Sequence, residues 1–235
     1  MLRFKPTLLL MSAAALGAAT PPAEGGCARA VENPALLNVR EIVAGYTACE
    51  EECRAEDAAF LLLLGMIRAT TDFAVLQPSH SVDIFEDPSV LPVLQLANVD
   101  MDPDFSRDVA GFDRMLRRVR EARLGGPPEY APGWDVAPSA KHELYDLFLN
   151  GLRESVLATE VYLAGLLRDD RYYTAYVERG QIIEQFQEGD RLGDRYGELG
   201  ELMLRVVAEL GDPPSSGPMV PWRLLYEPGP KSGFV

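Results

Sequence analysis

The chain has 235 residues, of which 47% are hydrophobic and 25% are charged. These values are typical of a globular protein that is long enough to bury a sizeable core. Its 36 acidic and 22 basic residues give a net charge of −14. Such a charge disfavours nucleic acids and anionic lipid surfaces as partners. It favours encounter with a basic protein, although an acidic surface can also serve solubility alone.

The N-terminus has the layout of a secretory signal peptide. Arg3 and Lys5 form a positive segment, residues 8–17 form a short apolar segment, and the small residues 17–19 offer a cleavage site. We therefore predict that residues 1–19 are a signal peptide and that the protein is exported to the periplasm or cell envelope. Loss of Arg3 and Lys5, with no acidic residue, would change the net charge from −14 to −16.

Two segments open the mature chain. Residues 20–32 are rich in proline, glycine and small side chains, which predicts a linker. Residues 33–211 are predicted to form one all-α domain. Its first helix begins at Asn33-Pro34, which has the capping residue and first-turn proline of a helix start. Apolar residues at helical spacing then continue this helix to about Thr47.

The most apolar run of the mature chain, residues 58–76, is predicted to be the central helix of the domain. It is apolar nearly all round, so other elements must cover most of its sides. Its length approaches that of a membrane span, but Arg68 and Asp72 interrupt it, which favours burial in a protein core. Together with the first helix it is expected to form an antiparallel hairpin.

The later segments also show helical spacing, and none alternates long enough to predict a strand. The further predicted helices cover residues 90–99, 103–120, 139–168, 170–186 and 199–210. We therefore predict an all-α fold of about six or seven helices, arranged as an irregular bundle or helical-hairpin array without a substantial sheet. The proline-rich tail, residues 212–235, is expected to pack on this domain.

The cysteines allow one disulfide and leave one thiol over. Cys49 and Cys53 need only a local turn to meet, and we predict that they form the disulfide. If Glu50–Glu52 instead continue a helix, the pair is less suited to bridging. Cys27 is then the odd cysteine and a candidate lipidation site, since small residues precede it as in a lipoprotein signal. However, Glu24 stands where that signal has a leucine-like residue, and a free thiol is the alternative.

The sequence shows no motif for metal, cofactor or nucleophilic chemistry. His80 and His142 are far apart and lack the spacing of metal ligands. Residues 100–108 place aspartates at four positions of a calcium loop, but the glycine and the bidentate acid of that loop are missing. Asp102 also has a sufficient role as a helix cap. No metal and no cofactor are therefore predicted.

Two charged groups have a simple interpretation as solvated helix faces. The first is a run of arginines within residues 114–120. The second is a set of carboxylates that would support an enzyme only if two of them met in a cleft. This set comprises Glu154, Glu160, Glu184, Glu188 and Asp190.

The loop at residues 129–138 is the candidate binding site. It carries Tyr130 and Trp134 between prolines and a glycine, and exposed aromatic residues on such loops are frequent binding anchors. A tryptophan between two helices can equally close the edge of the core. We predict an exported envelope protein that binds another protein, as an adaptor or an inhibitor or immunity-type protein does. The alternatives are a carboxylate-dependent enzyme with its site in a helical cleft and a carrier of small apolar ligands.

Overall fold

The computed structural model describes residues 26–76, 78, 101–126, 129–138, 140, 142–185 and 193–211. The α-helices among these residues are α1 (Gly26–Glu32), α2 (Val39–Glu51), α3 (Ala55–Val75), α5 (Pro103–Arg107), α6 (Val109–Glu121), α7 (Tyr145–Arg168), α8 (Asp170–Gln185) and α9 (Asp194–Leu210). Two 3-10 helices are η1 (Pro34–Leu36) and η2 (His142–Leu144).

The prediction of an all-α fold is confirmed. The described residues contain no strand, and their only extended pairing is an isolated bridge between Pro78 and Val136. The predicted signal peptide, the predicted helix at 90–99 and the tail at 212–235 lie outside the described residues.

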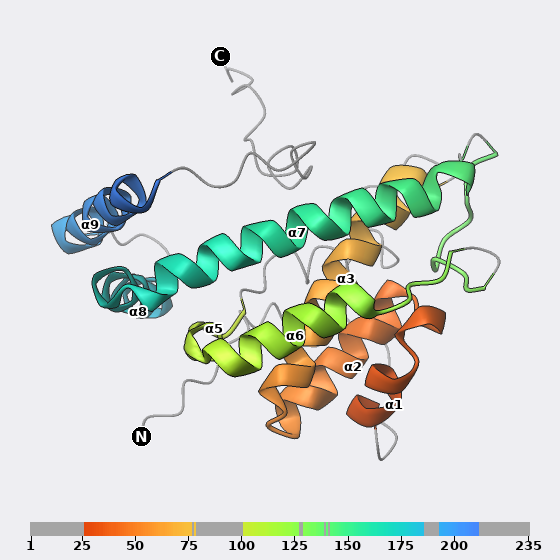
Figure 1. Cartoon of the computed structure of the whole chain (residues 1–235), viewed down its shortest axis with the longest axis horizontal. Helices are drawn as coiled ribbons and strands as arrows, with labels where there is room; N and C mark the ends of the chain where they lie inside the picture. Colours follow the sequence, from red (N-terminus) through yellow and green to blue (C-terminus); the bar gives the residue numbers. More distant parts are fainter. Residues whose placement is uncertain are drawn as a thin grey trace.

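Helix α3 is the central helix, as predicted. Most of its residues are buried, and α1, α2, α6 and α7 pack against it. In Figure 1 it passes behind α6 and α7, while α2 and α1 lie beside its first half. Among the described helices it is the one that is long and apolar enough to cross a membrane, and 78% of its most apolar window is buried inside the protein. This burial is typical of the core helix of a folded domain.

The start of the domain differs from the prediction. Residues 26–32, assigned to a linker, form helix α1, which packs on α2 and buries Cys27 and Ala30. The Asn33-Pro34 start produces only the short helix η1. Helix α2 begins later, because Asn38 accepts a hydrogen bond from the Glu41 backbone while the Glu41 side chain accepts one from the Asn38 backbone. This reciprocal pair satisfies two backbone donors of the first turn.

The helix predicted from residue 103 is divided in two. Asp102 caps α5 by accepting a hydrogen bond from the Asp104 backbone, as the cap-and-proline start predicted. Asp108 then ends α5 and caps α6 by accepting a hydrogen bond from the Gly111 backbone. Both carboxylates are therefore used as helix caps.

Three of the four arginines of α6 form ion pairs with acids of the described chain. Arg118 forms ion pairs of 3.1 Å with Glu56 and 2.8 Å with Asp57, both in the first turn of α3. Arg114 pairs with Glu56 at 2.9 Å. This corrects the interpretation of the whole run as a solvated face, because these two arginines join α6 to α3.

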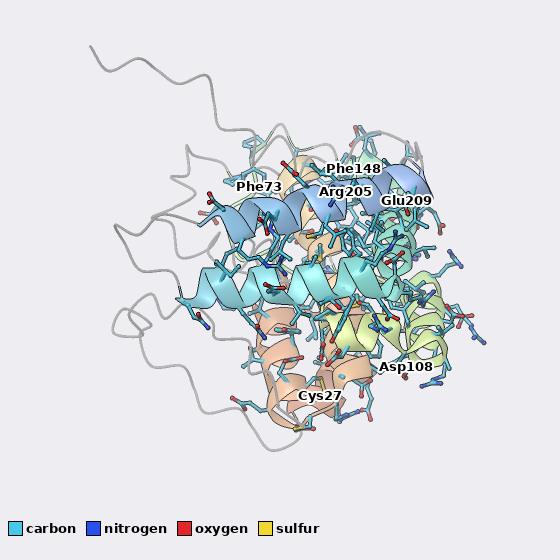
Figure 2. All side chains as sticks on the ribbon, turned by 90° about the vertical axis from the view of Figure 1, so that its left-hand side faces the viewer. Cys27, Phe73, Asp108, Phe148, Arg205 and Glu209 are labelled. Carbon is cyan, nitrogen blue, oxygen red and sulfur yellow. A yellow bond between two sulfur atoms is a disulfide. The ribbon has the colours of Figure 1, made fainter. Side chains whose placement is uncertain are left out.

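Helix α7 extends from the core to the α8–α9 pair. Helices α8 and α9 lie side by side in both views (Figures 1 and 2). Arg195 of α9 pairs with Glu178 of α8 at 2.6 Å, and Arg171 of α8 pairs with Glu209 of α9 at 2.7 Å. Figure 2 shows Glu209 in the upper part of the molecule and Cys27 at its lower edge, and Figure 1 shows α8 and α9 on the other side of the molecule from α1. The α8–α9 pair is thus far from the helices that carry the disulfide.

Candidate functional site

The aromatic loop at 129–138 is fastened to α3 through a buried carboxylate. Asp72, in the last turn of α3, is 0% exposed. Its Oδ1 accepts hydrogen bonds from the hydroxyl of Tyr130 in the loop and, at 2.6 Å, from the hydroxyl of Tyr145 at the start of α7. The two hydroxyl oxygens lie 2.7 Å apart. Asp72 therefore joins three segments that are distant in the sequence.

Burial is the largest influence on the pKa values of Asp72, Tyr130 and Tyr145. It raises the pKa of Asp72 to about 6, while the two tyrosine hydrogen bonds and the charge of Arg68 act in the opposite direction. Burial, followed by the charge of Asp72, also raises the pKa of Tyr130 and of Tyr145. Arg68 is fully buried and lies 3.9 Å from the centre of the Tyr130 ring. Its Nη2 donates a 3.0 Å hydrogen bond to the carbonyl of Ala35.

Trp134 ties the same loop to the end of α3. Its indole N–H donates a 2.6 Å hydrogen bond to the carbonyl of Leu76, and the side chain is half-buried. The bridge between Pro78 and Val136 lies next to this contact in the sequence. Trp134 thus closes the edge of the core, which was the alternative interpretation of this residue.

The prediction that Tyr130 is an exposed anchor is wrong. The side chain is only 8% exposed, because its ring packs in the core and its hydroxyl donates a hydrogen bond to the Asp72 carboxylate. A buried tyrosine can hold the loop in place, but it does not offer a surface to a partner. Tyr130 and Trp134 are brought to the same end of α3, where they have structural contacts.

The predicted disulfide is also wrong. The bond joins Cys27 to Cys49, whose Cα atoms are 4.7 Å apart. Glu50–Glu51 continue α2 beyond Cys49, so Cys49 stays in the core while Cys53, just past the helix, is exposed with a free thiol. Helix α1 brings Cys27 back onto α2, and the Cys27 thiol is consumed in the disulfide rather than available for lipidation. The leftover cysteine is Cys53.

The residues considered for metal or acid–base chemistry are not brought together. Among the described residues no group of three or more potential metal ligands converges. His142 is exposed in η2, and His80 lies outside the described residues. Glu154 is exposed on α7 and pairs with Arg120 at 3.5 Å, and Glu160 is half-buried on the same helix. The side chain of Glu184, together with residues 188 and 190, lies outside the described part of the chain.

A small pocket between α2, α3 and α5 does bring two carboxylates together. Glu50 near the end of α2 and Asp102 before α5 line it, together with Tyr46. The pocket volume is about 10 Å³. Its remaining lining is apolar and consists of Ala55, Ala59, Leu62, Met101 and Phe105.

Burial and the neighbouring carboxylates raise the pKa values of two groups in this acidic pocket. Burial and then Asp102 raise the pKa of Glu50. Burial, Glu50 and Asp102 together raise the pKa of Tyr46 to about 12. None of the ion pairs that the described residues form with one another includes Glu50 or Asp102. Among the described residues, the two carboxylates of the pocket therefore have no ion-pair partner, and apolar side chains line the rest of the pocket.

Sequence reasoning missed this pocket for a simple reason. In the sequence, Glu50 stands between the two cysteines predicted to bridge and Asp102 is sufficient as a helix cap, so neither residue by itself indicates a pocket. The two residues are far apart in the chain, and only the packing of α5 beside α2 and α3 makes them neighbours. Comparison of the chain with protein-family models, with curated proteins and with solved structures finds no match.

Proposed function

We propose that the protein is an exported envelope protein that binds a basic protein partner, and that the acidic pocket receives a lysine side chain of that partner. The observation that carries this proposal is the pair of carboxylates, Glu50 and Asp102, on one pocket without a cation from the described chain. The net charge of −14 supports it further, because a negative surface increases the rate of encounter with basic proteins.

The size of the pocket favours lysine over arginine. A volume of about 10 Å³ is close to that needed for one water molecule. A lysine ammonium is a compact point charge, whereas an arginine guanidinium is a wider planar group. A space this small can take only the ammonium, and the methylene stem would lie along the pocket rim.

The disulfide supports the export part of the proposal. Cys27 and Cys49 are both buried and bonded to each other, and such bonds persist mainly in oxidising compartments outside the cytosol. Intact mass of the mature product tests export directly. A product that begins after about residue 19 is expected, and one that retains Met1 would contradict the signal peptide.

The binding proposal is tested with a defined probe. Two twelve-residue peptides of glycine and serine carry four lysines or four arginines, and backbone amide shifts at Tyr46–Glu50 and Met101–Phe105 are followed by NMR during titration. We expect the lysine peptide to shift these amides and the arginine peptide to bind more weakly. Because Glu50 and Asp102 are exposed at the pocket rim, each contributes about 1 kcal/mol, or about fivefold in Kd.

The matched variants distinguish an effect of the pocket from an effect of the overall negative charge of the protein. Glu50→Gln with Asp102→Asn removes both charges while asparagine retains the helix-capping role at 102. The control, Glu51→Gln with Asp113→Asn, removes the same charge from exposed positions that do not line the pocket. Loss of lysine-peptide affinity in the first pair alone is the expected result. Equal losses in both pairs, or an arginine peptide that binds as tightly, would count against a lysine pocket.

The other function classes have less support. A ligand carrier lined by α3 would need an apolar cavity beside this helix, but α1, α2, α6 and α7 cover it. An enzyme acting through Glu50 and Asp102 needs room for a substrate, and the pocket is close to the size of one water molecule. The geometry of the pocket therefore favours binding of a lysine ammonium over catalysis or the carriage of an apolar ligand.

A further inference from the structure

Two buried charged residues on α3 have polar atoms without partners. Arg68 and Asp72 are both 0% exposed and lie one helical turn apart. Within the described part of the chain, Asp72 Oδ2 has no hydrogen-bond partner, and neither has Arg68 Nε or Nη1. The remaining polar atoms of the two side chains do have hydrogen-bond partners. Asp72 Oδ1 accepts hydrogen bonds from two tyrosine hydroxyls, and Arg68 Nη2 donates one to the carbonyl of Ala35.

The two side chains are neighbours that do not touch. None of the ion pairs within 4.0 Å that the described residues form with one another includes Arg68 or Asp72, yet the positive charge of Arg68 lowers the pKa of Asp72 against the effect of burial. A donor and an acceptor that are too far apart for a direct bond, and that are shielded from solvent, are the usual partners of a buried water molecule.

We infer that Arg68 and Asp72 hold an ordered water molecule between them. Its oxygen accepts a hydrogen bond from Arg68 Nε or Nη1, and one of its O–H groups donates to Asp72 Oδ2. The chemistry of the site selects a neutral occupant: the carboxylate disfavours an anion and the guanidinium disfavours a cation. Water is the small neutral molecule that both accepts and donates.

The aromatic loop seals this hydration site. The Tyr130 ring lies 3.9 Å from the Arg68 guanidinium, and its hydroxyl binds Asp72. Trp134 fastens the same loop to Leu76. The water is therefore expected to exchange with solvent only when residues 129–138 lift from α3, so its residence time reports the opening of this loop.

The test is water–protein cross-relaxation by NMR on the full chain labelled with ¹⁵N-arginine. The Arg68 Nε–H signal, assigned by its loss in Arg68→Met, should show cross-relaxation with a water whose residence exceeds about a nanosecond. Tyr130→Phe keeps the ring over the site and should keep the water. Tyr130→Ala removes the ring and should shorten the residence time by about tenfold or more.

Two results would overturn the inference. One is an observed Arg68 Nε–H signal without any cross-relaxation to a long-lived water. The other is a high-resolution crystal structure of the unmodified protein in which Arg68 binds Asp72 directly and no water lies between them. The crystal structure decides the question even if Arg68→Met does not fold.

Discussion

Tyr145 donates a 2.6 Å hydrogen bond to Asp72 from a position 73 residues further along the chain. This bond fixes the start of α7 against the last turn of α3. Tyr130 shares the same carboxylate oxygen, so one buried acid determines where the loop and two helices meet. The hydrogen bonds of such a cluster are strong only while every member is in place.

The first prediction concerns pH. The pKa of Asp72 rises from 3.8 to about 6 on folding, mainly because of burial. Between these values the folded protein binds more protons than the unfolded chain, so the contribution of Asp72 to stability is fully present below pH 3.8 and is lost as the pH rises through 6. The full difference amounts to about 3 kcal/mol, and roughly half of it falls between pH 7.5 and pH 5. Urea unfolding at pH 7.5 and pH 5 should show greater stability at the lower pH.

Asp72→Asn provides the control for this prediction. It removes the titrating group while retaining an amide oxygen of similar shape, and it should flatten this part of the pH dependence. The difference between the two proteins isolates Asp72 from the other acids. An identical pH dependence in both would show that the buried carboxylate does not titrate in this range.

The second prediction concerns Trp134. Trp134→Phe keeps an aromatic ring but removes the N–H that donates to Leu76, and should cost about 1 kcal/mol of unfolding free energy. Trp134→Ala also removes the packed ring and should cost about 2 kcal/mol or more. Asp135→Ala, at an exposed position of the same loop, should stay within about 0.5 kcal/mol. Equal stability of all three variants would mean that the indole does not fasten the loop.

The third prediction concerns the cysteines. The Cys27–Cys49 bond closes a loop with a sequence separation of 22, and Cys27→Ala should lower stability by about 3 kcal/mol. Cys53→Ser, at an exposed free thiol, should be nearly neutral. Peptide mapping without reduction should recover Cys27 joined to Cys49 and Cys53 labelled by a thiol reagent. Recovery of a Cys49–Cys53 peptide would contradict the assigned pairing.

The fourth prediction compares two glycines inside helices. A Cβ added at Gly45 of α2 would lie 2.4 Å from the Ala30 Cβ of α1, so Gly45→Ala should force the helices apart and cost about 1–3 kcal/mol. At Gly151 of α7 an added Cβ meets nothing within 4 Å. Gly151→Ala should therefore stabilise the protein by about 0.5–1 kcal/mol. Thermal unfolding of the two variants should shift in opposite directions, and a Gly45→Ala variant as stable as the wild type would mean that α1 does not pack closely on α2.

Local patterns predicted much of the fold. The apolar surface of residues 58–76 required a buried helix, and the Asp102-Pro103 start capped a helix as expected. The division of the next helix at Asp108 carried a local signal too, since an aspartate three residues before Gly111 is a suitable cap. These features depend on neighbours within one or two turns, which a sequence displays directly.

The site residues depended on contacts between distant segments. The nearby pair Cys49 and Cys53 looked suited to bridging, but continuation of α2 separated them and the fold-back of α1 supplied Cys27. Tyr130 looked exposed because its loop is rich in proline and glycine. Its burial required a carboxylate 58 residues earlier in the chain. No spacing rule connects such partners.

Helix α7 has 24 residues and so spans about 36 Å. Its far end packs on α5, where the Leu167 carbonyl accepts a 3.0 Å hydrogen bond from Arg107, and leads directly into α8. Because the principal contacts of α9 are with α8, the two helices are expected to move as one unit with the end of α7. A bend in this one helix would carry both helices with it, and would first have to break the contacts of Arg107 with the Leu167 carbonyl and with Asp170 that join them to α5.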